Sequence, residues 1–201
     1  MITQKIDNRL NGYLKERAEF AGLSPSLQKK LEKWDESKRD IERPNWVSYF
    51  LGHAFLASTR SVDARTQHGC VLVDSFTNTI ISEGYNGFIR DIDDRILPNY
   101  DSEKYPFILH SEINCLLNCA RQGRTTLNST LYITGLPCLN CLQSLYQAGV
   151  TKIFYGNKYS NMLDNQDYKD SLELFKYLIQ GKMTIMHVDF DEEKLEELIK
   201  C

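Results

Sequence analysis

The chain lacks the features that place a protein in a membrane or on a secretory route. None of its uncharged apolar stretches approaches the ~20 residues that a membrane span requires. The first ten residues, MITQKIDNRL, carry charges where a signal peptide needs its apolar run. We therefore expect a soluble, cytoplasmic protein whose 201 residues form one domain with appended helices.

An excess of positive charge is also missing. The chain has 24 Lys and Arg against 27 Asp and Glu, a formal net charge of −3, and the two signs are interleaved along its length. Proteins that follow a nucleic-acid backbone usually show a basic stripe, because their binding releases counterions from phosphates. The composition argues against a polynucleotide partner and is still compatible with a local basic pocket.

Six cysteines are present without a secretory signal, so a disulfide framework explains them poorly in a chain of this length. Cys138 and Cys141 form a C-x-x-C pair that suits a metal ion. Apolar patterns typical of a protein core surround Cys70, Cys115 and Cys119. The sequence thus predicts thiols of two kinds, metal ligands and small core residues.

Residues 1–42 are highly charged and form a predicted helical extension to the domain at 43–201. Asp7 is a candidate cap for a first helix, and Ser24 with Pro25 marks a sharp start for a second. The few apolar anchors are typical of a solvated hairpin packed on the domain or on a neighbouring subunit. A dedicated partner-binding or regulatory role is the alternative.

From residue 43 onward the pattern alternates between strands and helices. Helices are expected over 46–59, 111–122, 138–148 and 171–179, and a charged helix ends the chain. Strands are expected at 68–74, 79–85, 129–135, 151–156 and near 184–189, with an irregular acidic stretch between 88 and 106. This alternation predicts an α/β protein of three layers, with a mixed sheet of about five strands.

The chemistry of the chain lies in HSE at 110–112 and PCLNC at 137–141. Each motif falls where a strand or loop enters a predicted helix, and the N–H groups there favour the thiolates of Cys138 and Cys141. Their i, i+3 spacing puts both sulfurs on one face of the first turn, and His110 adds a nitrogen. One nitrogen and two thiolates suit one Zn²⁺ ion per chain, with the fourth position open for water, as a catalytic site requires.

Glu112 distinguishes a catalytic zinc site from a structural one, because it lies two residues beyond the histidine and can shuttle protons without coordinating the metal. Zinc lowers the pKa of bound water to about 7, so a nearby carboxylate can take its proton and pass it to a ring nitrogen and a leaving amine. H-x-E followed by P-C-x-x-C is the signature of zinc-dependent nucleobase deaminases. The alternatives are a structural zinc site and a thioredoxin-like dithiol, which leaves His110 and Glu112 unexplained.

From residue 43 to about 190 the chain resembles the deoxycytidylate (dCMP) deaminases of the zinc-dependent cytidine and deoxycytidylate deaminase superfamily. The matching segments, in the family's order, are RPNWVSYF, RSVDARTQHG, GYNG, DDRILP, KYPF, HSEINCL and NKYSN. GYNG with the long insertion before His110 discriminates most, since the tRNA adenosine and riboflavin-pathway deaminases typically lack this combination. The resemblance implies a cytidine-deaminase-like α/β/α fold, hydrolysis of dCMP to dUMP and ammonia for thymidylate supply, and a homo-oligomer, often a hexamer.

The same resemblance implies roles for residues around the metal motifs. Asn86, in the GYNG turn, would donate to the sugar 3′-hydroxyl, although Asn-Gly is also a common turn pair. Arg60 and Ser61 would hold the 5′-phosphate, Arg60 through paired donors, unless it is only a solvated charge. The other expected nucleotide contacts are Lys158 and Tyr159 in a closing loop, the amide of Ser111 and the carbonyl of Leu136.

Several positions depart from the family's pattern. Val62 replaces a lysine near the expected phosphate, where Arg65 could compensate. His68 and Cys70 replace valine and alanine beside the base, and His68 either is a hydrogen-bonded core residue or alters the pocket. Phe88 follows GYNG where the family often has a proline, in a region that serves an allosteric nucleotide with Mg²⁺. Regulation by dCTP and dTTP is therefore an open question at this point.

Other functions are compatible with the same residues. A deaminase of RNA or single-stranded DNA needs a basic, aromatic-lined groove, and the acidic segment at 91–103 argues against one. CMP, dCTP or a 5-substituted dCMP would fit the same motifs as dCMP, because loops make the discriminating contacts. In a non-catalytic zinc scaffold, the charged hairpin at 1–42 would be the working part.

Overall fold

The computed structural model describes residues 22–36, 43–96, 98–100, 102–159 and 163–200. Residues 46–200 form one compact unit, and residues 1–45 belong to a second. In that second unit, helix α2 (Pro25–Glu36) begins at the predicted proline, and the Ser24 carbonyl accepts the N–H groups of Leu27 and Gln28. The first predicted helix, with its candidate cap Asp7, lies outside the described residues.

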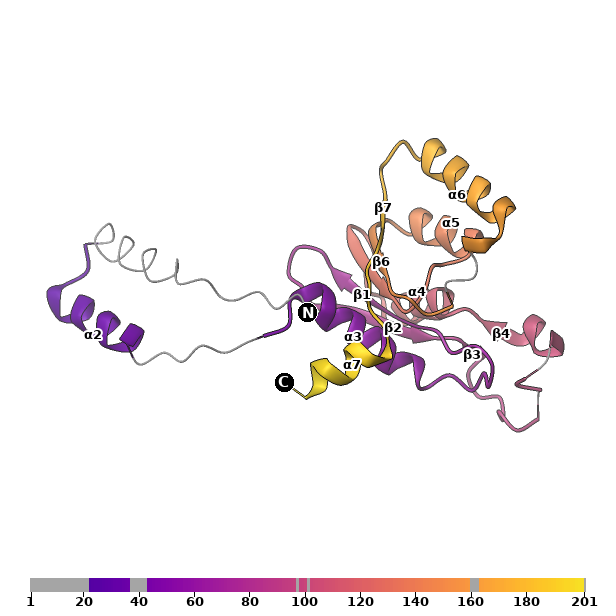
Figure 1. Ribbon diagram of the computed structural model, residues 1–201, viewed down its shortest axis with the longest axis horizontal. Coiled ribbons are helices and arrows are strands. Elements are labelled where there is room, and N and C mark those ends of the chain that lie inside the picture. The colour runs from indigo at the N-terminus through magenta and orange to yellow at the C-terminus, as the bar shows by residue number, and fades with distance from the viewer. Residues whose placement is uncertain (1–21, 37–42, 97, 101, 160–162, 201) are drawn as a thin grey trace. The chain divides into compact units, whose positions relative to one another are not determined.

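The unit at 46–200 is built on a five-stranded mixed sheet in the order β2-β1-β5-β6-β7 (Figure 1). The strands are β1 (Gly69–Asp74), β2 (Ile80–Tyr85), β5 (Ser129–Ile133), β6 (Val150–Tyr155) and β7 (Thr184–His187). β1 pairs antiparallel with β2 and β5, whereas β5, β6 and β7 run parallel. The predicted mixed sheet is confirmed, and each strand lies within two residues of its expected bounds.

Helices cover both faces of this sheet. They are α3 (Trp46–Ser58), α4 (Ser111–Gln122), α5 (Leu139–Gln147), α6 (Gln166–Leu178) and α7 (Glu192–Ile199). α3 and α7 contact each other on one face, while α4, α5 and α6 form a contiguous layer on the other. No helix in the described part of the chain is long and apolar enough to cross a bilayer.

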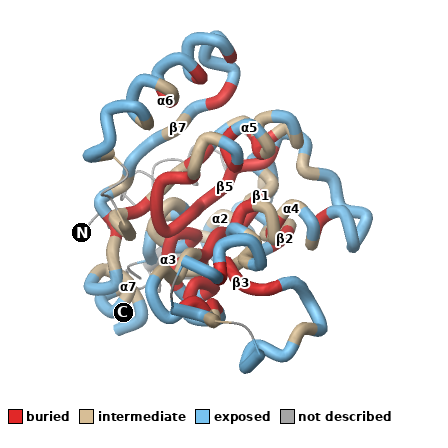
Figure 2. Tube along the Cα trace, turned by 90° about the vertical axis from the view of Figure 1, so that its right-hand side faces the viewer, coloured by how far each residue is buried: buried red, intermediate tan, exposed pale blue. Residues whose placement is uncertain are grey.

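Two cores result from the alternation of side chains along the strands. Val71 and Tyr132 face the α3 side, whereas Leu72 and Leu131 face the α4 side. Figure 2 shows burial concentrated in β1 and β5, the central strands. The three cysteines predicted to be core residues are all buried on the α4 side: Cys70, Cys115 and Cys119.

The stretch expected to be irregular contains short regular elements. β3 (Gly87–Phe88) pairs antiparallel with β4 (Ile108–Leu109), and the 3-10 helix η1 (Ser102–Phe107) precedes β4. Strands of two residues leave no periodicity in a sequence, which is why the prediction missed them. β4 leads directly to His110, so this small sheet fixes where the first metal-binding motif begins.

Helix α6 begins five residues earlier than the expected start at 171. Asn165 caps it, because the Asn165 side chain accepts the N–H of Tyr168 at 3.1 Å. The first turn is polar, so it has no apolar periodicity that would predict a helix there.

Gly84 lets β2 approach the start of α4. A Cβ atom at this position would lie 2.3 Å from the carbonyl oxygen of Ser111 and 2.6 Å from the amide of Cys115. The Asn114 side chain also donates to the carbonyl of Tyr85 at 2.9 Å. The first glycine of GYNG therefore allows the helix that follows His110 to lie directly against the sheet.

Candidate metal centre and substrate cavity

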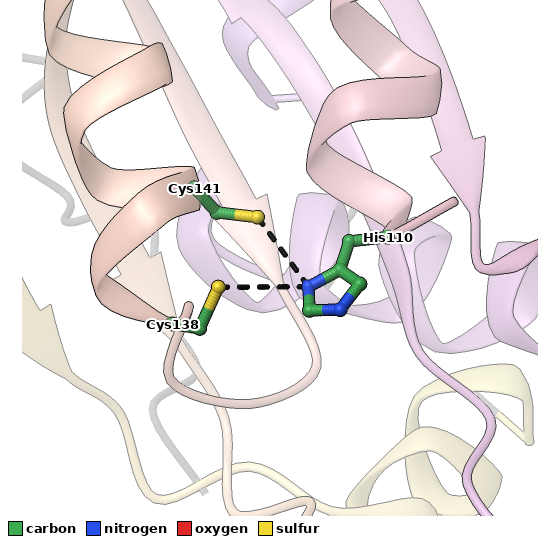
Figure 3. Close-up of side chains that lie close together, drawn as sticks. All are labelled: His110, Cys138 and Cys141. Atoms are coloured by element: carbon green, nitrogen blue, oxygen red, sulfur yellow. Dashed lines mark hydrogen bonds between the residues drawn. The ribbon is translucent and has the colours of Figure 1, made fainter. Parts of the chain in front are cut away.

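His110, Cys138 and Cys141 converge from the starts of two helices (Figure 3). His110 is the N-cap residue of α4 and Cys138 that of α5, and neither side chain makes a capping hydrogen bond. The His110 Nδ1 atom lies 3.6 Å from Cys138 Sγ and 3.5 Å from Cys141 Sγ. The three predicted ligands are thus brought together at one point.

These separations fit a tetrahedral zinc ion. Zn–S bonds of about 2.3 Å and Zn–N bonds of about 2.0–2.1 Å place nitrogen and sulfur about 3.6 Å apart at a tetrahedral angle. All three ligand atoms lie within 4.8 Å of one another, and no other group among the described His, Cys, Asp and Glu residues meets this spacing. One nitrogen and two sulfurs leave the fourth position for water, as in a catalytic zinc site.

The surroundings favour the thiolate form of Cys138, whereas the hydrogen bond with Cys138 and burial raise the pKa of the Cys141 thiol. Hydrogen bonding from Cys141, with His110 nearby, lowers the pKa of the Cys138 thiol to about 4. The hydrogen bond between His110 and Cys138 raises the pKa of His110. Tyr168 donates to the carbonyl of Pro137 at 2.5 Å, so α6 holds the residue directly before Cys138.

Glu112 is buried beside the metal ligands, with 4% of its surface exposed. Burial raises the pKa of its carboxyl, and hydrogen bonds from its own backbone N–H and from Ser111 offset part of this effect. The Ser111 hydroxyl donates to Glu112 Oε2 at 2.8 Å. A carboxyl group with a raised pKa is suited to taking up a proton and returning it near neutral pH.

A cavity of about 210 Å³ opens onto these residues. Its lining residues are Asp63, Thr66, His68, Asn86, Tyr105, Ile108, His110, Ser111, Glu112, Leu136 and Cys138. They include two groups of residues: the metal ligands His110 and Cys138, and Asn86 with its hydrogen-bond partners Asp63, Thr66 and His68. Three of the predicted substrate contacts therefore share a cavity with the metal ligands: Asn86, Ser111 and Leu136.

Asn86 is held by hydrogen bonds on both sides of its carboxamide. Its Oδ1 atom accepts the N–H of His68 at 2.7 Å, which fixes the orientation of the amide. Its Nδ2 atom donates to the carbonyl of Thr66 at 2.7 Å and to Asp63 Oδ2 at 3.5 Å. Both amide hydrogens are engaged, so the free capacity is the second lone pair of Oδ1. The side chain is poised to accept a hydrogen bond, whereas the resemblance implied a donor.

The other predicted contacts do not line the cavity. Arg60 is exposed and Ser61 is buried just after α3, where the Ser61 hydroxyl accepts the N–H of Asp63 at 3.2 Å. The Lys158 ammonium bonds to Ser58 Oγ at 3.2 Å and to Glu192 at 3.1 Å. These partners lie on α3 and α7, and they account for the lysine without a substrate.

Tyr159 supports the cavity indirectly. Its hydroxyl accepts the N–H of Gln67 at 2.9 Å, and its ring lies 4.8 Å from that of His68, between centroids. Its backbone has φ of 53°, in the left-handed region that non-glycine residues seldom adopt. Tyr159 therefore holds the segment that leads into His68.

Sequence reasoning missed a buried ion pair at the same cavity. Lys104 Nζ lies 2.5 Å from Asp63 Oδ1, and the two side chains are 0% and 4% exposed. The same oxygen accepts the N–H groups of Arg65 and Thr66, at 2.9 and 2.8 Å. The partners are 41 residues apart and no spacing rule links them. The segment KYPF, which contains Lys104, supports the family resemblance. It does not indicate a partner or a role for this lysine.

Comparisons with known proteins agree with this geometry. The family model described as the zinc-binding region of cytidine and deoxycytidylate deaminases matches residues 44–157. A probable deoxycytidylate deaminase of Drosophila melanogaster is 32% identical over 181 residues, 82% of this chain and 87% of that protein. The deoxycytidylate deaminase of Homo sapiens is 34% identical over 61% of this chain and 70% of its own. The apo crystal structure of dCMP deaminase from cyanophage S-TIM5 aligns with a TM-score of 0.56 and 25% identity, over 73% of this chain and 99% of that one.

Proposed function

The chain belongs to the cytidine and deoxycytidylate deaminase zinc-binding family, and on that premise we propose that it hydrolyses dCMP to dUMP and ammonia. The observation that carries the proposal is that His110, Cys138 and the buried Glu112 line one cavity, with Cys141 completing the ligand set behind it. A structural zinc site has four protein ligands, so it needs neither an open position nor a buried carboxyl group beside the metal. The choice of dCMP is supported by the relatives, which are deoxycytidylate deaminases.

Glu112 is the proton carrier of this reaction. Zinc, when bound, supplies a water activated for attack at neutral pH. Glu112 takes one proton from that water as the C–O bond forms at C4 of the cytosine, and delivers it to N3. It then takes the proton of the new hydroxyl and gives it to the amine as the C4–N bond breaks. The products are dUMP and ammonia, and the Ser111 hydroxyl holds the carboxylate in place through both transfers.

The remaining predicted contacts have the following roles in the proposal, and Asn86 changes from donor to acceptor. The Ser111 amide and the Leu136 carbonyl meet the edge of the pyrimidine, and both residues line the cavity. The Asn86 Oδ1 atom accepts from a sugar hydroxyl, in keeping with its free lone pair. Arg60 and Ser61 are assigned to the 5′-phosphate, and Lys158 and Tyr159 to the loop that closes over the nucleotide.

We also propose a cytoplasmic homo-oligomer on the pattern of the family, with residues 1–42 as an extension to the deaminase domain at 43–201. Size-exclusion chromatography of the zinc-loaded protein, with light scattering to give the mass of the eluted species, tests the assembly. A mass of several chains supports it, and a mass of one chain contradicts it.

A substrate panel tests the proposed reaction. Zinc-loaded protein is incubated separately with dCMP, CMP, dCTP and a cytosine-containing single-stranded oligonucleotide, and ammonia is measured. We expect dCMP to give the highest kcat/KM. Ammonia release from the oligonucleotide alone would favour the polynucleotide function, and no release from any compound would overturn the assignment as a deaminase.

A further inference from the structure

His68 belongs to the group of residues around Asn86 that lines the cavity. It directly precedes β1, and its backbone N–H donates to Asn86 Oδ1 at 2.7 Å while its carbonyl accepts the N–H of Asn86 at 3.1 Å. His68 lines the same cavity as Asn86 and His110. His68 and Asn86 are therefore directly bonded neighbours in the lining of one cavity.

The hydrogen bonds around Thr134 fix which nitrogen of His68 carries a proton. Thr134 is fully buried, its Oγ1 atom accepts the N–H of Gly69 at 3.2 Å, and this oxygen lies 3.1 Å from His68 Nδ1. If Nδ1 carried the proton, the hydroxyl would accept twice and its own proton would have no acceptor among the described residues. The hydroxyl therefore donates to Nδ1, and the ring proton lies on Nε2.

The ring is uncharged at neutral pH. Burial, with smaller contributions from Lys158 and His110, lowers the pKa of His68 to about 4. Within the described residues, Nε2 has no hydrogen-bond partner, while Nδ1 is bonded to Thr134. The residues that line the cavity thus include a neutral N–H donor on His68 and a carboxamide oxygen with a free lone pair on its neighbour Asn86.

We propose that His68 determines specificity for the sugar of the substrate, because it binds a sugar hydroxyl together with Asn86. The hydroxyl donates to Asn86 Oδ1 and accepts from His68 Nε2. A hydroxyl group has one proton to give and lone pairs to offer, so an adjacent acceptor and donor complement it. The inference rests on the proposed function, in which the substrate is dCMP. Its deoxyribose has one free hydroxyl, at the 3′ position, and that is the group recognised.

The experiment compares two substrates in three proteins. Ammonia release gives kcat/KM for dCMP and for 2′,3′-dideoxy-CMP, which lacks the hydroxyl, with wild type, His68→Val and the matched control His187→Val. His187 is an exposed histidine on β7, outside the cavity lining. We expect His68→Val to lower kcat/KM for dCMP about tenfold and that for the dideoxy compound less than about twofold. His187→Val should change neither value.

Equal losses on both substrates would overturn the inference, because they indicate a structural role, and so would no loss on either. If His68→Val does not fold, histidine ¹⁵N spectra of the wild type decide the matter. The inference requires a proton on Nε2 whose signal shifts with dCMP and not with the dideoxy compound. A proton on Nδ1 would contradict it. Wild-type protein that releases no ammonia from dCMP would instead overturn the proposed function.

Discussion

Replacing Lys104 with methionine should lower the free energy of unfolding by about 3–4 kcal/mol. The methionine side chain keeps most of the apolar stem of lysine and removes the charge that lies 2.5 Å from Asp63. Breaking one side of a buried ion pair costs about 3–5 kcal/mol, because the remaining charge is left uncompensated. The lower part of that range applies, since Asp63 keeps the N–H groups of Arg65 and Thr66 as donors.

Urea unfolding of the zinc-loaded protein at pH 7 measures this loss. The double variant Lys104→Met with Asp63→Asn removes both charges and should be more stable than Lys104→Met alone. Lys200→Met is the matched control, because Lys200 is exposed and pairs with Glu196 within one helix turn, where an ion pair contributes little. A loss below about 1 kcal/mol in Lys104→Met, or a double variant less stable than the single one, would refute the reasoning.

Three further predictions concern the metal, the cavity histidine and α6. Cys141→Ser should lose most of its zinc and its deaminase activity, because one of three ligands is gone; the metal content of the purified protein checks this. His68→Val should flatten the pH dependence of stability. The pKa of His68 falls from 6.5 to about 4 on folding, so only the unfolded chain gains this proton between those values and stability drops as the pH falls. Urea unfolding at pH 7 and pH 5 measures the difference. Tyr168→Phe should lower stability by about 1 kcal/mol with zinc retained, since the bond to the carbonyl of Pro137 is lost.

Each of these predictions has a contrary result. Full zinc content in Cys141→Ser would remove this cysteine from the metal site. An unchanged slope of stability with pH in His68→Val would mean that His68 is not held uncharged by burial. Loss of zinc in Tyr168→Phe would mean that this bond is essential to the metal site and does more than support the loop before Cys138.

The metal site could be predicted from the sequence because its geometry is local. Cys138 and Cys141 are separated by one helical turn, and His110 and Glu112 by two residues, so helix starts fix most of their arrangement. The sheet was predictable for the same reason, since β1 and β5 are short, mostly apolar runs that are buried along nearly their whole length. The meeting of the two motifs is a long-range feature, and the deaminase signature of H-x-E followed by P-C-x-x-C predicted it.

The sugar side of the cavity could not be predicted, because long-range hydrogen bonds build it. Whether Asn86 gives or accepts a hydrogen bond depends on Thr66 and His68, which take up its other capacity. The partners of Lys158 are also long-range, since its ammonium pairs with Glu192 on α7 and bonds to Ser58 on α3. A sequence shows which groups can bond, and only the packed chain shows which of them are already engaged.

The most direct test of the central claim is a comparison of wild type with Glu112→Gln on dCMP, with zinc measured in the same samples. Wild type should release ammonia and dUMP in equal amounts. Glu112→Gln should bind as much zinc and lose about 10²–10⁴-fold in kcat, the usual contribution of a proton carrier. The absence of ammonia in wild type, or undiminished turnover in Glu112→Gln, would contradict the account.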